Sequence, residues 1–150
     1  MMPPGILDRM PIRWQKGGLI GSGAFGKVFL GLNLDTGELL AVKQVALVGE
    51  HNKEVESFEQ EIDVMRGLSH ENIVQYRGIC FEDDHLNIFL EYVPGGSISS
   101  LLVKFGAFSE SIIRVYTRQI LQGLDYLHSH HIIHRDIKGR KCYAFSLLMN

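Results

Sequence analysis

The chain has little cysteine, with two thiols, Cys80 and Cys142, among 150 residues. They lie far apart in the sequence and form no Cys-x-x-Cys pair, so the sequence offers no disulfide framework. We therefore expect both thiols to be reduced and the protein to be cytoplasmic.

Neither sign of charge is in excess, because 15 Lys and Arg residues face 17 Asp and Glu residues. This balance gives no electrostatic reason to expect a nucleic acid partner. No apolar run approaches the roughly 20 residues that span a membrane, so we expect no membrane partner. Residues 1–13 carry three of the four prolines and lack the features of a signal peptide, which predicts an irregular leader.

Three glycines stand at the spacing G-x-G-x-x-G, in the order Gly21, Ser22, Gly23, Ala24, Phe25 and Gly26. Glycine has no Cβ, so its backbone can approach a bulky ligand, and phosphate held by main-chain N–H groups is the usual one. Three motifs share this spacing: the P-loop, the dinucleotide-binding loop, and a glycine loop that joins two antiparallel strands.

The residues after the glycines favour the third motif. A P-loop needs serine or threonine after Lys27, where this chain has Val28, and a helix must begin there. The dinucleotide-binding loop needs the same helix. Residues 28–32 are instead rich in strand formers, so we expect one strand over residues 14–24 and a second over residues 28–33.

A lysine interrupts the apolar run of the next predicted strand, residues 38–45, which follows a turn at residues 35–37. Burying an ammonium group is costly unless it meets a negative partner. A lysine at a strand edge can also extend its charged end into water. Composition alone leaves both interpretations of Lys43 open.

A helix expected over residues 52–68 offers the partner, because its apolar residues recur at intervals of three and four. Glu61 lies beside this apolar stripe, eighteen positions after Lys43. A glutamate on a helix usually serves only solubility, but one beside the buried stripe favours an ion pair. We expect Lys43 to pair with Glu61, which would orient the lysine toward phosphate.

The remaining elements follow from periodicity and capping residues. Strands are expected at about residues 76–81 and 86–90, and the breaking sequence at residues 94–97 ends this strand-rich part. Ser97 is the expected N-cap of a short helix to about residue 105, and Ser109 that of a long apolar helix to about residue 130. The histidines at or after its end are His128, His130, His131 and His134. They have no acidic ligand beside them on the helix, so structural or exposed histidines are favoured over a metal site.

The sequence H-R-D occurs at residues 134–136, two residues before Lys138. With the glycine loop and the strand lysine before it, the chain resembles a eukaryotic protein kinase over residues 14–139. It is most similar to the mitogen-activated protein kinase kinase kinases, plant-type members included, in the stretches 31–45, 68–76 and 89–97.

The resemblance implies an α+β fold. A kinase N-lobe with a five-stranded antiparallel sheet and one long helix would be followed by the first two helices of an incomplete C-lobe. The implied segments are an irregular leader (1–13), the N-lobe (14–93), the start of the C-lobe up to the catalytic loop (94–139) and a non-matching tail (140–150).

The resemblance also implies a site for ATP with Mg²⁺. The residues around adenine would be Ile20, Val28 and Ala41, with Leu90 as gatekeeper and the backbones of Glu91 and Val93 as hydrogen-bond partners. The residues over the phosphates would be those from Gly21 to Gly26, with Lys43 held by Glu61.

Asp136 would accept the proton of the substrate hydroxyl, and Lys138 would neutralise the transferring phosphoryl group. A lysine two positions after the aspartate is the pattern of serine/threonine kinases. The implied substrate is a downstream kinase, a mitogen-activated protein kinase kinase.

The tail departs from the family pattern. The motif H-R-D-x-x-x-x-N requires asparagine at position 141, where this chain has Lys141, and no D-F-G follows. The family's metal ligands are thus missing, and we expect phosphoryl transfer to be impaired. We interpret the chain as truncated after the H-R-D-I-K-G sequence. A non-catalytic module that binds nucleotide, a chaperone or a full-length kinase remains an alternative, as does a product without a folded role.

Overall fold

The computed structural model describes residues 12–23, 26–47, 60, 62–82, 84–143 and 146–147. The chain divides into two compact units, each described here by itself. Unit 1 consists of Met1–His51 and Arg77–Tyr92, and unit 2 consists of Asn52–Tyr76 and Val93–Asn150. The lobe boundaries expected from the sequence stay predictions.

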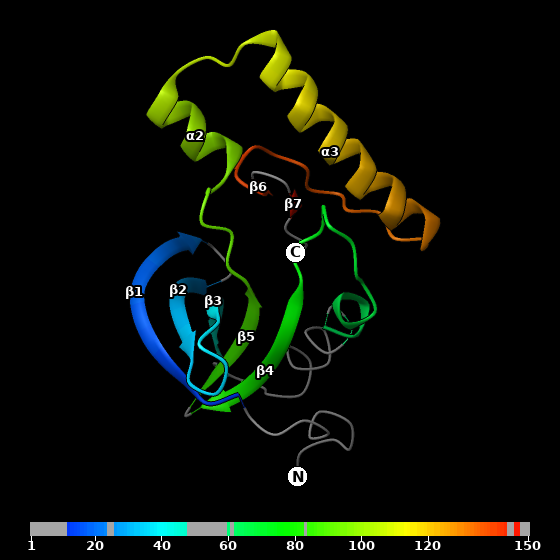
Figure 1. Ribbon diagram of the computed structural model, residues 1–150. Helices are drawn as coiled ribbons and strands as arrows, with labels where there is room; N and C mark the ends of the chain where they lie inside the picture. Colours follow the sequence, from blue (N-terminus) through cyan, green and yellow to red (C-terminus); the bar gives the residue numbers. More distant parts are fainter. Residues whose placement is uncertain are drawn as a thin grey trace. The chain divides into compact units, whose positions relative to one another are not determined.

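A five-stranded sheet dominates unit 1, in the strand order β1-β2-β3-β5-β4 (Figure 1). The strands are β1 (Trp14–Gly23), β2 (Gly26–Asn33), β3 (Leu39–Ala46), β4 (Tyr76–Glu82) and β5 (His85–Glu91). Neighbours β1–β2, β2–β3 and β3–β5 pair antiparallel. The α+β class implied by the resemblance and the five strands predicted from strand-forming residues are confirmed.

One face of this sheet forms the apolar core of unit 1. Leu40, Val42 and Phe89 have no exposed surface. The ring of Trp14 packs edge-on against that of Phe89, with 5.5 Å between the ring centroids. Because side chains alternate along a strand, the residues that lie between these core positions belong to the opposite face.

A chain of hydrogen bonds runs across the sheet and fixes the alignment of its strands. Lys16 Nζ donates to Gln44 Oε1 (3.0 Å), and Gln44 Nε2 donates to Asn87 Oδ1 (3.0 Å). The Nδ2 of the fully buried Asn87 then donates to Glu82 Oε2 (2.9 Å). Burying an amide without hydrogen-bond partners is costly. A strand slip that broke these hydrogen bonds is therefore disfavoured.

Unit 2 contains two described helices, α2 (Ile98–Phe105) and α3 (Glu110–Ser129). Residues 62–66 are also helical, but most of the helix predicted over residues 52–68 lies outside the described residues. Ser97 caps α2 as predicted, since its side chain accepts a hydrogen bond from the Ser100 N–H. Ser109 occupies the N-cap position of α3 but makes no capping hydrogen bond, because its hydroxyl pairs with that of Ser111.

The core of unit 2 includes a residue of the tail. Leu68, Ile73, Leu127 and Cys142 form one buried cluster. Cys142 begins β6 (Cys142–Tyr143), which pairs antiparallel with β7 (Ser146–Leu147). One residue of the segment that departs from the family pattern, Cys142, therefore belongs to the packed interior.

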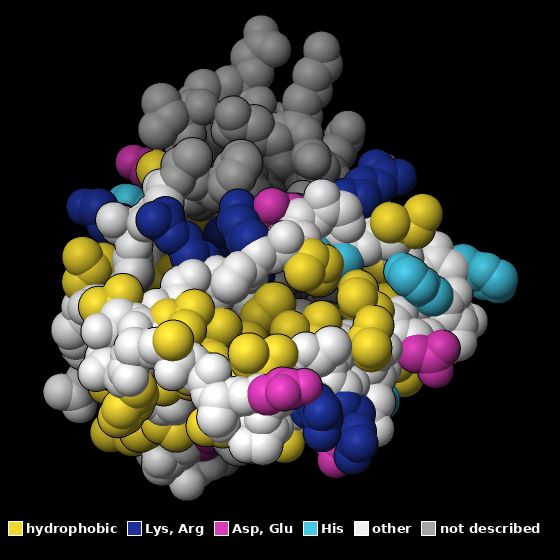
Figure 2. Space-filling model, turned by 90° about the horizontal axis from the view of Figure 1, so that it is seen from above, with side chains coloured by type: hydrophobic (Ala, Val, Ile, Leu, Met, Phe, Trp, Pro, Cys, Tyr) yellow, Lys and Arg dark blue, Asp and Glu magenta, His cyan; other side chains and the backbone are white. Residues whose placement is uncertain are grey.

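One side of α3 packs on this core and the other is exposed. Its exposed large apolar residues are Ile112, Ile113, Val115 and Leu121. Hydrophobic side chains gather across the middle of the face shown in Figure 2. None of the described helices combines the length and apolar character needed to cross a membrane.

Two glycines close the hairpin between β1 and β2, where Gly23 lies opposite Gly26. Gly26 has a φ of +127°, and a Cβ there would collide with the carbonyl oxygen of Gln44 in β3. Gly23 has open space around it. The third glycine of the motif thus lets two strands approach, quite apart from any ligand.

We predict that Gly26→Ala lowers the free energy of unfolding of unit 1. The backbone strain alone should cost about 1–3 kcal/mol, and the collision with Gln44 adds to this cost. Gly23→Ala, the matched control across the same hairpin, should change it by less than about 1 kcal/mol. Urea unfolding followed by the fluorescence of Trp14, the single tryptophan, measures both. Equal losses in the two variants would show that the contact with Gln44 does not constrain the hairpin.

Candidate functional site

The strand register gathers four of the predicted nucleotide-binding residues on one face of the sheet. Val28 lies opposite Lys43, and Ala41 lies opposite Leu90. Residues paired across antiparallel strands share a face, so Val28, Ala41, Lys43 and Leu90 all belong to the face opposite the Trp14 core. Lys43 is half-buried among them. A flat apolar surface with one ammonium group beside it suits an aromatic base that carries phosphates.

The glycine motif lies along the edge of this face. Gly21 is opposite Val28, and Ser22 is opposite Lys27, before the hairpin closes at Gly23 and Gly26. Ile20 precedes the motif at an irregularity of β1 and is 46% exposed. Ala24 and Phe25, at the tip of the motif, lie outside the described residues.

The other predicted residues of the adenine site are placed with less detail. Glu91 ends β5, opposite Leu40, and is half-buried. Val93 begins the second segment of unit 2, and its carbonyl accepts a hydrogen bond from the Gly96 N–H (3.1 Å). Glu61 lies outside the described residues, so the ion pair between Lys43 and Glu61 stays a prediction.

A loop of unit 2 carries the predicted catalytic aspartate. His134 is buried, and its Nδ1 accepts a hydrogen bond from the Asp136 N–H (3.3 Å). Between them Arg135 has a φ of +64°, a left-handed conformation that is unfavourable for a residue with a side chain. Such strain persists only where surrounding contacts fix the backbone, and it is commonest at functional sites.

Two lysines contact the same oxygen of Asp136. The Nζ of Lys141 lies 2.7 Å from Asp136 Oδ2, and the Nζ of Lys138 lies 3.0 Å from it. The Lys141 side chain is only 16% exposed, against 51% for Lys138. The sequence alone identifies Lys141 only as a cation in place of a metal-binding asparagine. The excess of cations around one carboxylate in residues 135–141 is the signal that could have predicted this pairing.

Backbone contacts fix the position of Lys141. Its N–H donates to the Lys138 carbonyl (2.8 Å), and the Cys142 N–H donates to the same carbonyl (3.1 Å). The Gly139 carbonyl accepts a hydrogen bond from the Ser99 N–H at the start of α2 (3.0 Å). The turn is thus anchored on both sides.

The two ammonium groups lower the pKa of Asp136 from 3.8 to about 2, with the hydrogen bond from Lys141 as the largest cause. The carboxylate is therefore a weaker base than an ordinary aspartate. Hydrogen bonding of its charged form, not burial, is responsible.

The residues of this loop do not fit Mg²⁺. Magnesium requires several oxygen ligands in octahedral geometry. At Asp136 the ammonium groups of Lys138 and Lys141 occupy the approach to Oδ2. Position 141 supplies the fourth cationic side chain of residues 135–141, where the family motif has the amide oxygen of asparagine. Across the described part of the chain, no three His, Cys, Asp or Glu residues are grouped as metal ligands.

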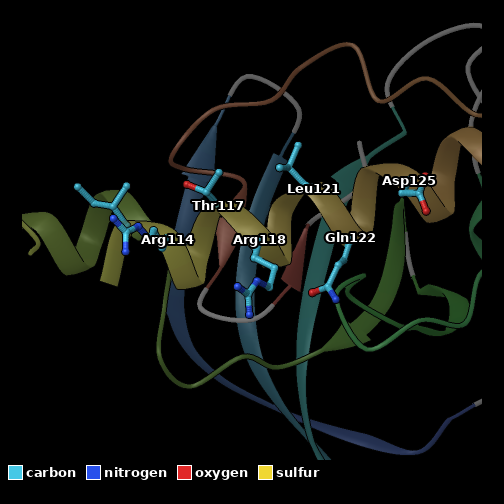
Figure 3. A pocket seen from close by; sticks show the side chains of 7 residues that line it. Arg114, Thr117, Arg118, Leu121, Gln122 and Asp125 are labelled. Carbon is cyan, nitrogen blue, oxygen red and sulfur yellow. The ribbon is translucent and has the colours of Figure 1, made fainter. Parts of the chain in front are cut away.

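A shallow depression elsewhere in unit 2 contains none of the predicted site residues. All the side chains labelled in Figure 3 come from α3. The lining residues are Ile113, Arg114, Thr117, Arg118, Leu121, Gln122 and Asp125. It is the exposed side of one helix, without a convergent set of catalytic groups.

The sequence is similar to those of known proteins over most of its length. The protein kinase domain family matches residues 14–141. Mitogen-activated protein kinase kinase kinase 2 and mitogen-activated protein kinase kinase kinase ANP1, both of Arabidopsis thaliana, are each 60% identical, over 86% and 91% of this chain. Mitogen-activated protein kinase kinase kinase A of Dictyostelium discoideum is 59% identical over 89% of it. The chain spans only 21%, 22% and 15% of the length of these three relatives.

We predict that the Asp136 carboxyl titrates near pH 2 in the folded chain, as followed by carbon NMR. Its pKa is depressed on folding, so its stabilising effect is complete above about pH 4 and is lost as the pH falls toward 2. Lys141→Met should move the midpoint toward 3.8, whereas Arg140→Met, which removes an exposed charge of the same loop, should move it less. A wild-type midpoint at 3.8 contradicts the ion pairs.

Proposed function

The chain belongs to the protein kinase domain family, and we propose that it binds ATP as a serine/threonine protein kinase of the mitogen-activated protein kinase kinase kinase type. The names of its relatives support this type. Its substrate would be a serine or threonine of a mitogen-activated protein kinase kinase, within a mitogen-activated protein kinase cascade.

One observation carries the proposal for ATP: the register that puts Val28, Ala41, Lys43 and Leu90 on one face of the sheet, beside the glycine hairpin. Adenine would lie against Val28 and Ala41, with Leu90 at its edge. Lys43 would then contact the phosphates. Protein kinases use a glycine-rich loop and a β3 lysine for this purpose, and they catalyse mainly by positioning and electrostatics.

The loop of unit 2 supplies the groups for the acceptor. Asp136 would accept the proton of the substrate hydroxyl, and Lys138 would balance the charge of the phosphoryl group. Kinases of this family use ATP with Mg²⁺, but the Asp136 loop of this chain does not fit the metal ion.

The ion pair between Lys141 and Asp136 favours a second candidate function. A carboxylate bonded to two ammonium groups is a poor proton acceptor. The chain would then bind nucleotide, or a partner such as a chaperone or a full-length kinase, without efficient transfer. We propose impaired catalysis for this chain, and a cytoplasmic location in keeping with its two free thiols, Cys80 and Cys142.

We predict weak ATP binding, measured by calorimetry, that Lys43→Met weakens about 10–100-fold. This is the effect of losing a hydrogen bond to a charged group, about 1.5–3 kcal/mol. Lys27→Met is the matched control, because Lys27 lies opposite Gln44 and therefore on the other face of the same sheet.

The control should bind like the wild type. Equal losses in both variants would place the nucleotide elsewhere, and the absence of any heat or thermal shift with ATP would overturn the nucleotide assignment.

We predict that the purified chain transfers phosphate from ATP to a catalytically dead mitogen-activated protein kinase kinase at least about 1,000-fold more slowly than the 1–100 s⁻¹ of typical kinases. Phosphate incorporation should not exceed that of Asp136→Asn. Transfer at an ordinary rate that depends on Asp136 would refute the impairment and support a fully active enzyme.

A further inference from the structure

We propose that Lys141, which stands where the family motif has a metal-binding asparagine, pairs with Asp136 as an internal cation and excludes a divalent metal ion from this loop. The exclusion follows from the loop itself, and its meaning for phosphoryl transfer rests on the proposed function.

The geometry at Asp136 carries the proposal. Both ammonium groups contact Oδ2, at 2.7 Å from Lys141 and 3.0 Å from Lys138. Lys141 is the shorter and the more buried of the two contacts, with 16% of its side chain exposed. A divalent ion that bound Asp136 through this oxygen would first have to displace an ammonium group with little access to water.

The backbone keeps Lys141 in this position. The turn from Lys138 to Cys142 is closed by two hydrogen bonds to the Lys138 carbonyl. Cys142, the next residue, is 3% exposed within the core of unit 2. A shift of the Lys141 backbone would therefore disturb a buried neighbour, so its side chain extends toward Asp136 from a fixed position.

The charge of the loop has the wrong sign for a metal ion. One carboxylate and two lysines leave a net positive charge, and Arg135 and Arg140 add to it. A cation would be repelled, whereas a phosphate oxyanion would meet ammonium groups that need no metal bridge. The loop is thus arranged for anionic groups without a divalent ion.

Titration with Mn²⁺ tests the exclusion on the full chain labelled with nitrogen-15. The amide signals to follow are those of Ile137 and Gly139, which come one and three residues after Asp136. In the wild type they should show no selective broadening up to about 1 mM Mn²⁺, a concentration at which weak carboxylate sites fill. Lys141→Asn should bind Mn²⁺ at least about 10-fold more tightly than the wild type and broaden both signals. Arg140→Asn removes one positive charge from the same loop but leaves the ion pair, and it should behave like the wild type.

Lys141→Arg serves as a second variant, because it retains the positive charge at position 141. It should show no selective broadening with Mn²⁺. Selective broadening in the wild type overturns the proposal, as does equal broadening in Lys141→Asn and Arg140→Asn, which would show a general effect of charge. If Lys141→Asn does not fold, the wild-type titration alone still decides.

Calorimetry with ATP separates this proposal from the proposed function. The wild type should bind ATP equally well in excess EDTA and in Mg²⁺, within about 2-fold, and Lys141→Asn should bind more tightly in Mg²⁺. Mg²⁺-dependent binding by the wild type overturns the exclusion. A chain that binds no ATP in either condition contradicts the nucleotide assignment instead, while the Mn²⁺ titration remains valid.

Discussion

The register of β3 between β2 and β5 is the constraint on which the site of unit 1 depends. A slip of one residue would move Lys43 and Ala41 to the Trp14 face of the sheet. It would also move Val42 to the opposite face, which Lys43 and Ala41 now occupy. Two features oppose the slip: the packing of Val42 against Phe89, and the hydrogen bond from Gln44 to the buried Asn87. Residues on one face of the sheet therefore fix the position of the proposed nucleotide-binding surface on the other face.

In unit 2 the equivalent constraint is the balance of charge at one carboxylate. Metal-dependent sites bring carboxylates together and let an ion compensate them. Here the protein compensates Asp136 with its own side chains, and it retains the strained backbone at Arg135 and the buried His134 beside it. The loop has the H-R-D sequence of the protein kinase motif, but an ammonium group stands at position 141, where that motif has asparagine.

Much of the fold was predictable because it follows from local patterns. Runs of strand-forming residues between turn signals predicted the strands, and capping residues predicted α2 and the start of α3. The sequence left open whether Lys43 is buried, and the strand register places it on the face opposite Trp14. The contact between Lys141 and Asp136 was missed, because it depends on a turn and on the burial of Cys142, which no periodicity reports. The hydroxyl of Ser109 was misjudged because Ser111 competes for it.

The burial of Cys142 has a consequence for how this sequence can vary. Position 142 closes a cluster with Leu68, Ile73 and Leu127, so evolution can exchange it only for another small apolar residue. Its neighbour at position 141 is not part of that cluster, and its side chain pairs with Asp136 instead. Mutations at position 141 can therefore change the charge of the loop while the core of unit 2 stays the same. The fold can then persist in descendants in which the chemistry of the loop has changed.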